Sequence, residues 1–394
     1  MSKYLFYTGN TGFPFGHAQV ERQKLIAKGL TLMDCSVTVL NTYGVHRPGT
    51  HSETFSQDQY DGIRFIYSSG TPYRSSSFLK RNLLKAKGTL NAVRVLYLHR
   101  RKKQLDAMLV TCNSVFTVMF YGIIGWLLRV PVVIDVVEYR GATKIPKSLF
   151  KKMDHYLYDR WYHLFVKKII CISDFLLNVA KRNKIKRPLI KIPSIVDYSL
   201  FDNIKAEPAN TPFYLYCGST HYFEIILFII ESFEKLNDNS RNLCLVLHGD
   251  SQRIQKVKEL ISQGSRKDAV IVMSNLPYEK LVSLYKSAYA LLIPLRNTFQ
   301  DIARFPHKVG EYCAAGRPII STNIGEVGSF FRDMDTAMLA ESYDEGQFEA
   351  KMRTLSTNSQ LADTMGNKSY LLGKNNFDYI YLGKQVYRFI FDQK

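Results

Sequence analysis

The sequence has few cysteines and no hydrophobic run long enough to cross a membrane. Its six cysteines are scattered, with no Cys-x-x-Cys pair and no spacing typical of metal ligands, which predicts reduced thiols in a cytosolic protein. The longest apolar run, residues 115–128, holds 14 residues, whereas a transmembrane helix needs about 20. We therefore expect a buried helix there and no transmembrane anchor. The first residues, MSKYLFYTGN, lack the apolar core and cleavage site of a signal peptide and are typical of a strand.

Acidic residues are scarce in the first half of the chain. Residues 1–200 contain 31 Lys and Arg against 12 Asp and Glu, whereas residues 201–394 contain 22 of each, so the whole formal net charge of +19 lies in the first half. Solvated helix faces account for single lysine clusters, but an excess confined to one half indicates an anionic partner: a membrane surface, a polyphosphate or a nucleic acid. No helix-turn-helix, RNP or zinc pattern is present, which argues against nucleic acid.

Short β-branched runs alternate with helical stretches along the chain of 394 residues, 46% of which are hydrophobic. This alternation is typical of α/β proteins with parallel sheets covered on both sides. The pattern restarts after a polar stretch at residues 202–212. We therefore predict two Rossmann-like domains, residues 1–205 and 206–394. The last helix, about residues 376–394, has an aromatic face that either domain could cover.

The stretch RFPHKVGEYCAAGRPIIST, residues 304–322, combines helix signals with charged groups. Pro306 suits a first helical turn and Gly316 a helix end. The free N–H groups at such a helix start bind anions, and Arg304 and Lys308 add full charges there. Glu311 lies one turn further along the same side and could accept two hydrogen bonds from the diol of a ribose. Lys308 and Glu311 could instead form an ordinary surface ion pair, worth under about 1 kcal/mol.

The position of this helix favours the ligand interpretation. It follows the strand ALLIPL, and ligands of open α/β sheets collect at the carboxyl ends of the strands. The stretch FPHKVGEYCAAGRPIISTNIGEVGSFF also resembles the donor-binding signature of the retaining glycosyltransferases of family 4, which have the GT-B fold. Glu311 matches the second of that family's two glutamates, whereas Ala303 stands where the family has the first. Similar segments lie within residues 216–295.

The resemblance implies a GT-B enzyme whose two domains face each other across a cleft. The N-terminal domain would hold the acceptor and the C-terminal domain a nucleotide-diphosphate sugar, such as a UDP- or GDP-sugar. Catalysis would rest on Lys308, Arg304 and Glu311. The implied donor-binding residues are Gly16, Gly218, Ser219, His248, Leu276, Lys308 and Glu311. On the acceptor side the resemblance points to His17, Asp135 and Glu138. For the two carboxylates, helix capping or a satisfied loop carboxylate is the default interpretation, and His17 and His248 are more often structural than catalytic.

From this resemblance and the charge distribution we expect retaining transfer of a sugar to a saccharide acceptor, in cell-surface polysaccharide or glycan synthesis. A polyprenyl-diphosphate-linked acceptor would explain the basic first half, and places the chain in the cytoplasm, peripheral at the inner face of the plasma membrane. No metal or other cofactor is expected, since cationic side chains would neutralise the diphosphate. The alternative is a nucleotide-sugar epimerase, or a non-catalytic nucleotide-sugar binder, of the same fold.

Overall fold

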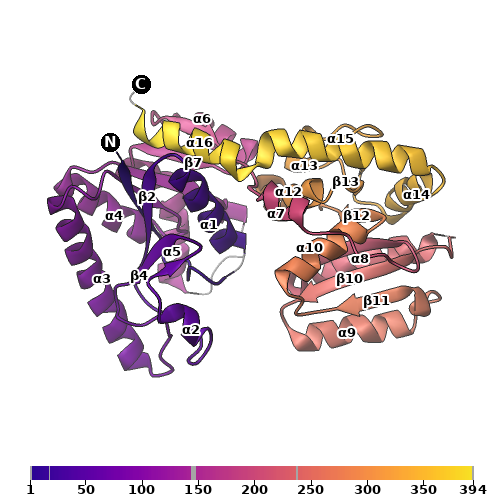
Figure 1. The fold of residues 1–394 in the computed structure, drawn as a ribbon, viewed down its shortest axis with the longest axis horizontal. Coiled ribbons are helices and arrows are strands. Elements are labelled where there is room, and N and C mark those ends of the chain that lie inside the picture. Colours follow the sequence, from indigo (N-terminus) through magenta and orange to yellow (C-terminus); the bar gives the residue numbers. More distant parts are fainter. Residues whose placement is uncertain (1, 17, 143–147, 237, 393–394) are drawn as a thin grey trace. The chain divides into compact units, whose positions relative to one another are not determined.

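The structure, a computed structural model, describes residues 2–16, 18–142, 148–236 and 238–392. The chain forms two compact units (Figure 1). Unit 1 comprises Met1–Ile195 and Tyr379–Lys394, and unit 2 comprises Val196–Asp378. Each unit is an α/β fold built around one sheet, so the α/β class with two Rossmann-like halves is confirmed.

Unit 1 contains an eight-stranded sheet in the order β3-β4-β2-β1-β5-β6-β7-β8. All neighbouring strands run parallel except β3 and β4. The strands are β1 (Lys3–Thr8), β2 (Cys35–Asn41), β3 (Gln59–Tyr60), β4 (Ile63–Tyr67), β5 (Ala107–Val110), β6 (Val132–Val136), β7 (Lys168–Cys171) and β8 (Leu189–Lys191). The helices are α1 (Ala18–Thr31), α2 (Ser52–Phe55), α3 (Phe78–Arg101), α4 (Val115–Leu128), η1 (Arg140–Ala142), α5 (Leu149–Trp161), η2 (Tyr162–Phe165), α6 (Asp174–Arg182) and α16 (Tyr379–Phe391).

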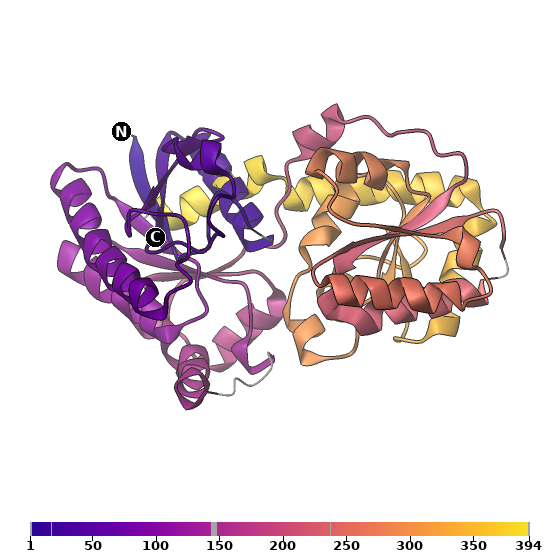
Figure 2. The same cartoon turned by 90° about the horizontal axis from the view of Figure 1, so that it is seen from below.

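Successive side chains of the central strand β1 point alternately into two apolar layers of unit 1. Leu5 and Tyr7 belong to a core shared with α1 and α16, whereas Phe6 meets the ring of His99 from α3, with ring centroids 4.9 Å apart. Helix α16, yellow in Figures 1 and 2, lies beside α1. Glycine is needed at this crossing, because a Cβ on Gly383 would come 2.5 Å from the Cα of Gly29.

Unit 2 contains a six-stranded sheet in the order β11-β10-β9-β12-β13-β14, with every neighbouring pair parallel. The strands are β9 (Phe213–Ser219), β10 (Asn242–His248), β11 (Val270–Met273), β12 (Ala290–Ile293), β13 (Ile319–Thr322) and β14 (Met338–Ala340). The helices are α7 (Tyr198–Asn203), η3 (Thr220–Tyr222), α8 (Phe223–Lys235), α9 (Ser251–Ser262), η4 (Lys267–Ala269), α10 (Tyr278–Ser287), α11 (Phe299–Ala303), α12 (His307–Ala314), α13 (Gly325–Phe330), α14 (Glu345–Ser356) and α15 (Ser359–Phe377).

The change of unit falls at residues 195/196 and again at 378/379, not at the predicted 205/206. The polar stretch at 202–212 lies inside unit 2, because α7, which ends at Asn203, already belongs to that unit. Helix α7 contacts α12, and the Lys286 ammonium of α10 donates hydrogen bonds to the carbonyls of Phe201 and Ile204, each at 2.6 Å.

The apolar run at residues 115–128 is a helix, but the expectation that it is buried is wrong. Helix α4 buries the side that carries Val118, Tyr121 and Ile124, whereas Trp126 is 78% exposed and Leu127 65% exposed. A helix laid on one face of a sheet buries only one side, and the absence of polar residues from its other side does not change that. Among the residues described, no helix is long and apolar enough to span a bilayer.

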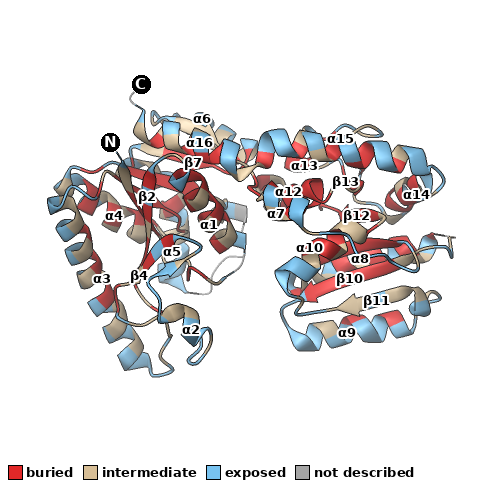
Figure 3. Cartoon of the chain, viewed as in Figure 1, coloured by how far each residue is buried: buried red, intermediate tan, exposed pale blue. Residues whose placement is uncertain are grey.

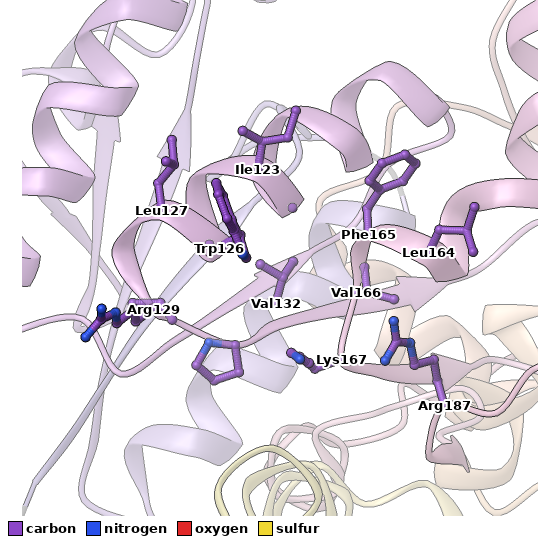
Figure 4. Close-up of a pocket in the computed structure, with 14 residues that line it drawn as sticks. Ile123, Trp126, Leu127, Arg129, Val132, Leu164, Phe165, Val166, Lys167 and Arg187 are labelled. Atoms are coloured by element: carbon purple, nitrogen blue, oxygen red, sulfur yellow. The ribbon is translucent and has the colours of Figure 1, made fainter.

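A groove of about 950 Å³ lies at the C-terminal end of α4 (Figure 4). Trp126, Leu127 and Ile123 contribute from α4, and Leu164 and Phe165 from η2. Its basic lining residues are Arg129, Lys167 and Arg187. This exposed apolar surface adjoins the N-terminal end of β6, the end opposite to that at which parallel sheets bind their ligands.

Candidate functional site

The sheet of unit 2 reverses its winding between β9 and β12. The chain proceeds from β9 outward to β10 and β11, and then returns to place β12 on the other side of β9. Open α/β sheets bind ligands at such a reversal of strand order, beyond the carboxyl ends of the strands. Ser219 ends β9 and Ile293 ends β12. The helix of the 304–322 stretch, α12, comes after β12 and α11 and therefore lies in the region that this topology favours.

Helix α12 is held against the sheet by its own side chains. Its N-cap is Pro306, one position earlier than a first-turn proline, and the side chain of Pro306 makes no capping hydrogen bond. The Cys217 backbone N–H donates to the Tyr312 hydroxyl at 3.1 Å, which ties the helix to β9. Gly316 follows the helix with φ +67°, a conformation that favours glycine. The first turn of the helix is therefore held in a fixed position against the sheet.

Glu311 is a buried carboxylate, only 4% exposed. The Tyr278 hydroxyl donates to Oε1 at 2.9 Å and the Tyr285 hydroxyl to Oε2 at 3.4 Å. Lys308 Nζ lies 3.7 Å from Oε2, and His307 Nε2 lies 3.7 Å from Oε1. A surface ion pair is thus the wrong description of Lys308 and Glu311, because both side chains are largely shielded from solvent.

Lys308 completes a short chain of hydrogen bonds to this carboxylate. Its ammonium donates to the Tyr285 hydroxyl at 3.3 Å, and that hydroxyl donates in turn to Glu311. Burial lowers the pKa of Lys308, but the Glu311 carboxylate and Cys217 together outweigh burial, so the pKa lies above its ordinary value. Burial is also the main cause of a strongly raised pKa of Tyr285. At neutral pH the site therefore holds a fixed ammonium beside a neutral phenol.

Arg304 differs from the expectation that it serves the diphosphate together with Lys308. Its guanidinium pairs with Asp301 at 2.7 Å and donates to the Tyr222 hydroxyl at 2.5 Å. Asp301 is completely buried and also accepts from Arg296 at 2.8 Å, and Arg296 in turn pairs with Glu224 at 2.9 Å. The two guanidinium charges are therefore matched by two carboxylates. Lys308 is paired with Glu311 in the same way, and the catalytic role of Arg304 stays a prediction.

The other predicted donor residues lie along the same edge of the sheet. Gly218 and Ser219 end β9, and His248, exposed, ends β10 directly beside Ser219 in the strand register. Gly218 has a packing reason to be glycine, because a Cβ would come 2.2 Å from the Tyr216 hydroxyl oxygen. Ser219 accepts a hydrogen bond from the His221 N–H at 3.2 Å. Leu276 is half-buried between β11 and α10.

The predicted residues of unit 1 do not form one site. Gly16 approaches Val20, whose Cγ2 would lie 2.4 Å from an added Cβ, and His17 lies outside the described residues. Glu138 is exposed and accepts from the Asn113 amide at 2.8 Å. Asp135 is a buried structural carboxylate, which the sequence could not reveal.

Asp135 does not line a surface, contrary to expectation. Its side chain is fully buried, and the Arg22 guanidinium binds both carboxylate oxygens, at 2.8 and 2.9 Å. The Arg22 guanidinium also donates to the Ile192 carbonyl at 2.8 Å, and the Tyr7 hydroxyl donates to Asp135 at 3.4 Å. The pKa of Arg22, which burial alone would lower, is raised by Asp135. This network joins β1, α1 and β6 inside unit 1 and leaves the carboxylate no access to an acceptor.

Sequence reasoning missed Tyr278, Tyr285, Asp301 and Arg296, which surround the predicted charges. Their only sequence signal is proximity to the strand β12, and the contacts themselves arise between separate helices. The described residues hold no group of three or more His, Cys, Asp and Glu side chains able to hold a metal ion. The metal-independent reaction stays a prediction.

The fold and this site define a two-unit α/β architecture of the kind found in GT-B glycosyltransferases. Residues 199–371 match the family model described as Glycosyl transferases group 1. An uncharacterized glycosyltransferase of Methanocaldococcus jannaschii is 20% identical over 199 residues, which are 50% of this chain and 52% of that protein. The chain thus spans about half the length of the curated relative it matches.

Solved structures resemble the chain over nearly its whole length. Sucrose-phosphate synthase from Thermosynechococcus elongatus has a TM-score of 0.74 at 15% identity, covering 98% of this chain and 97% of that one. HepE of Anabaena, solved in complex with UDP and glucose, has a TM-score of 0.71 at 13% identity, covering 99% and 100%. WaaG, a glycosyltransferase involved in lipopolysaccharide biosynthesis, has a TM-score of 0.64 at 15% identity, covering 99% and 100%. At these identities the likeness shows the fold.

Proposed function

We propose that this chain is a retaining glycosyltransferase that moves a sugar from a nucleotide-diphosphate sugar to a saccharide acceptor. The observation that carries the proposal is the chain of hydrogen bonds from Lys308 of α12 through Tyr285 of α10 to the buried Glu311 carboxylate, beside the switch point of the unit 2 sheet. The match to the group 1 family covers these residues, and HepE was solved with UDP-glucose. Both support a nucleotide sugar as the donor.

In this proposal Glu311 binds the ribose of the donor. A carboxylate offers about four acceptor positions, and Tyr278 and Tyr285 occupy two of them. Two acceptor positions are then left for the vicinal hydroxyls of a ribose. Because both tyrosines also fix the orientation of the carboxylate, the diol would meet a group that needs no reorganisation.

Lys308 and the positive dipole end of α12 would bind the diphosphate. During transfer the bond between the anomeric carbon and the β-phosphate oxygen breaks, and the diphosphate leaves with the electron pair. The acceptor hydroxyl bonds to the same face of the anomeric carbon, and its proton passes to an oxygen of the departing phosphate. A cation and N–H groups placed before this step stabilise the charge that develops on the diphosphate. No side-chain nucleophile and no metal ion enter this scheme.

The acceptor is proposed to be a polyprenyl-diphosphate-linked saccharide, used in polysaccharide or glycan synthesis at the cytoplasmic leaflet. The support is the charge distribution: the whole excess of +19 lies in residues 1–200. Unit 1, which contains most of those residues, is proposed to hold this acceptor. A lipid-linked diphosphate and an anionic leaflet are both attracted by such a surface.

Binding measurements on matched ligands would separate the proposed role of Glu311 in binding the ribose from that of Lys308 in binding the diphosphate. A thermal-shift screen of UDP, GDP, ADP and CMP first selects the preferred nucleotide. Calorimetry then compares that nucleotide with its nucleoside and with its 2′-deoxy form. Lys308→Met should weaken binding of the nucleotide about tenfold or more but spare the nucleoside, while Glu311→Gln should remove the preference for ribose over deoxyribose.

An exposed ion pair of the same unit provides the control. Lys235 and Glu345 lie 3.1 Å apart on α8 and α14, so Lys235→Met and Glu345→Gln make the same chemical changes away from the proposed site. They should bind every ligand as the wild type does. Equal losses in the control and site variants, or conversion of the nucleotide sugar to an epimer without acceptor, would contradict the proposal.

A further inference from the structure

Helix α3 is long but contributes little to the core of unit 1. It spans 24 residues, Phe78–Arg101, and buries only Gly88, Ala92 and Leu96. These three residues recur every four positions and so lie on one side of the helix. Figure 3 shows the rest of α3 mostly in the colours of exposed and intermediate residues.

The side of α3 away from the core carries a second apolar stripe. Leu79 is 79% exposed, Leu83 70% and Leu90 72%. Ala86, Val93 and Tyr97 are also exposed. Along the helix the six residues follow one another at steps of four, three, four, three and four, which places them on one face, about opposite to the buried side. Scattered exposed leucines are ordinary, but a contiguous stripe marks an interaction surface.

One edge of this stripe is regularly basic. Lys80, Lys87, Arg94 and Arg101 recur at intervals of seven residues, and all four are exposed. The segment 78–103 contains nine Lys and Arg and no Asp or Glu. The exposed face of α3 thus combines apolar side chains with cations of a single sign.

The orientation of this face is fixed by the packing of α3. A Cβ on Gly88 would come 1.8 Å from the Thr42 carbonyl oxygen, so glycine lets the helix lie directly on that backbone. The Ser68 hydroxyl donates to the Gly88 carbonyl at 2.8 Å, and the Asn91 amide donates to the Ser68 carbonyl at 2.9 Å. The helix therefore cannot turn its apolar stripe inward without losing these contacts.

Charge decides what can cover the stripe. In a coiled coil of two copies of α3, the flanking Lys and Arg would lie against identical Lys and Arg of the other copy, with no carboxylate in the segment to pair with them. A partner that covers this face must instead offer apolar groups to the stripe and negative charges to the Lys and Arg beside it. A helix with leucines and an aromatic on one face and Lys and Arg beside them is typical of helices that lie in the plane of a membrane interface.

We propose that α3 is a membrane-docking helix for anionic bilayers, with Leu79, Leu83 and Leu90 entering the acyl boundary and the basic edge contacting headgroup phosphates. The Arg100 guanidinium donates to the Leu128 carbonyl at 3.0 Å, so the end of α3 lies beside the end of α4, where Trp126 and Leu127 are exposed. The proposal names the surface through which the proposed glycosyltransferase would contact the membrane, and its biological role rests on that proposed function. Lipid binding itself needs no nucleotide.

Vesicle flotation with the full chain tests the proposal. The vesicles are neutral phosphatidylcholine, or phosphatidylcholine with about 30% phosphatidylglycerol, at low and high salt. We expect binding to the anionic vesicles that weakens with salt. Leu83→Gln/Leu90→Gln should lower the bound fraction about tenfold or more at low salt, and Lys87→Gln/Arg94→Gln should remove the preference for anionic lipid.

Matched variants on unit 2 provide the control. Leu371 of α15 is 60% exposed and Lys258 of α9 is exposed, so Leu371→Gln and Lys258→Gln should leave flotation unchanged. The α3 variants should keep the melting temperature and the nucleotide affinity of the wild type, which separates failure of this proposal from failure of the donor site. Wild-type flotation by the α3 variants, no flotation of the wild type at low salt, or a dimer in light scattering that the α3 substitutions dissolve would each overturn it.

Discussion

The two halves of the chain share one architecture but place their charges differently. In unit 2, the carboxylates and cations around α12 pair with one another: Glu311 with Lys308, and Asp301 with Arg304 and Arg296. In unit 1, the cations of α3 lie on an exposed face whose own segment contains no carboxylate. The same parallel sheet thus supports a site with internally balanced charge in one unit and a positive exterior in the other. Fold alone does not specify either; the loops and helices that follow the strands do.

The largest expected effect concerns the buried ion pair of unit 1. Arg22→Met leaves the Asp135 carboxylate buried without its partner, so we expect a loss of about 3–5 kcal/mol in the free energy of unfolding. Urea denaturation measures it. The double variant with Asp135→Leu should recover much of the loss, because no charge then stays buried. A fully stable Arg22→Met variant would show that Asp135 is not a structural carboxylate.

Next in size is the catalytic effect of the α12 pair. Glu311→Gln and Lys308→Met should each lower transfer by about 100-fold, because they remove groups that hold the ribose and the leaving diphosphate. The rates are measured with the preferred donor and a saccharide acceptor, and circular dichroism checks that the variants fold. Near-native turnover in either variant would place the site elsewhere in the chain.

A smaller effect is expected where α3 meets the sheet of unit 1. Gly→Ala normally stabilises a helix by about 1 kcal/mol, but Gly88→Ala should destabilise by about 1–3 kcal/mol because the new Cβ meets the Thr42 carbonyl. Gly346→Ala, at an exposed position of α14, is the control and should be neutral or stabilising. Stabilisation by both would mean that α3 does not rest on Thr42.

The smallest change is expected in thiol reactivity, where the two units should behave alike. All six cysteines are free and buried, and burial raises the pKa of Cys35 in unit 1 and of Cys244 in unit 2 to about 12. At about pH 8 the reactive thiolate is then scarce. A thiol reagent should label the native chain negligibly and all six sites after denaturation. Rapid labelling of one unit in the native state would show that its core opens.

Much of the fold follows from local sequence patterns. Strands β9 and β12 are short runs of mostly apolar residues, and α12 lies between a proline and a left-handed glycine, so each is defined by neighbouring residues. The same local signals gave the position of Lys308 and Glu311 on one side of a helix. What they could not give is burial: the shielding of Glu311 depends on Tyr278 and Tyr285 from α10.

Other errors also arose from contacts between distant segments. Asp135 seemed to line a surface because its partner Arg22 is 113 residues away. The lysines and arginines of α3 were recognised only as part of the basic first half, since α3 buries so few of its residues that its apolar periodicity points outward. Helix α4 seemed buried because its composition, unlike its packing, is apolar on all sides. Composition predicts which residues can be buried, and tertiary packing decides which are.

The most direct test of the account is a crystal structure of the chain with its preferred nucleotide diphosphate. The account predicts the diphosphate within hydrogen-bonding distance of Lys308 and the first turn of α12, and the ribose hydroxyls on Glu311. A nucleotide bound away from residues 304–311 would contradict it.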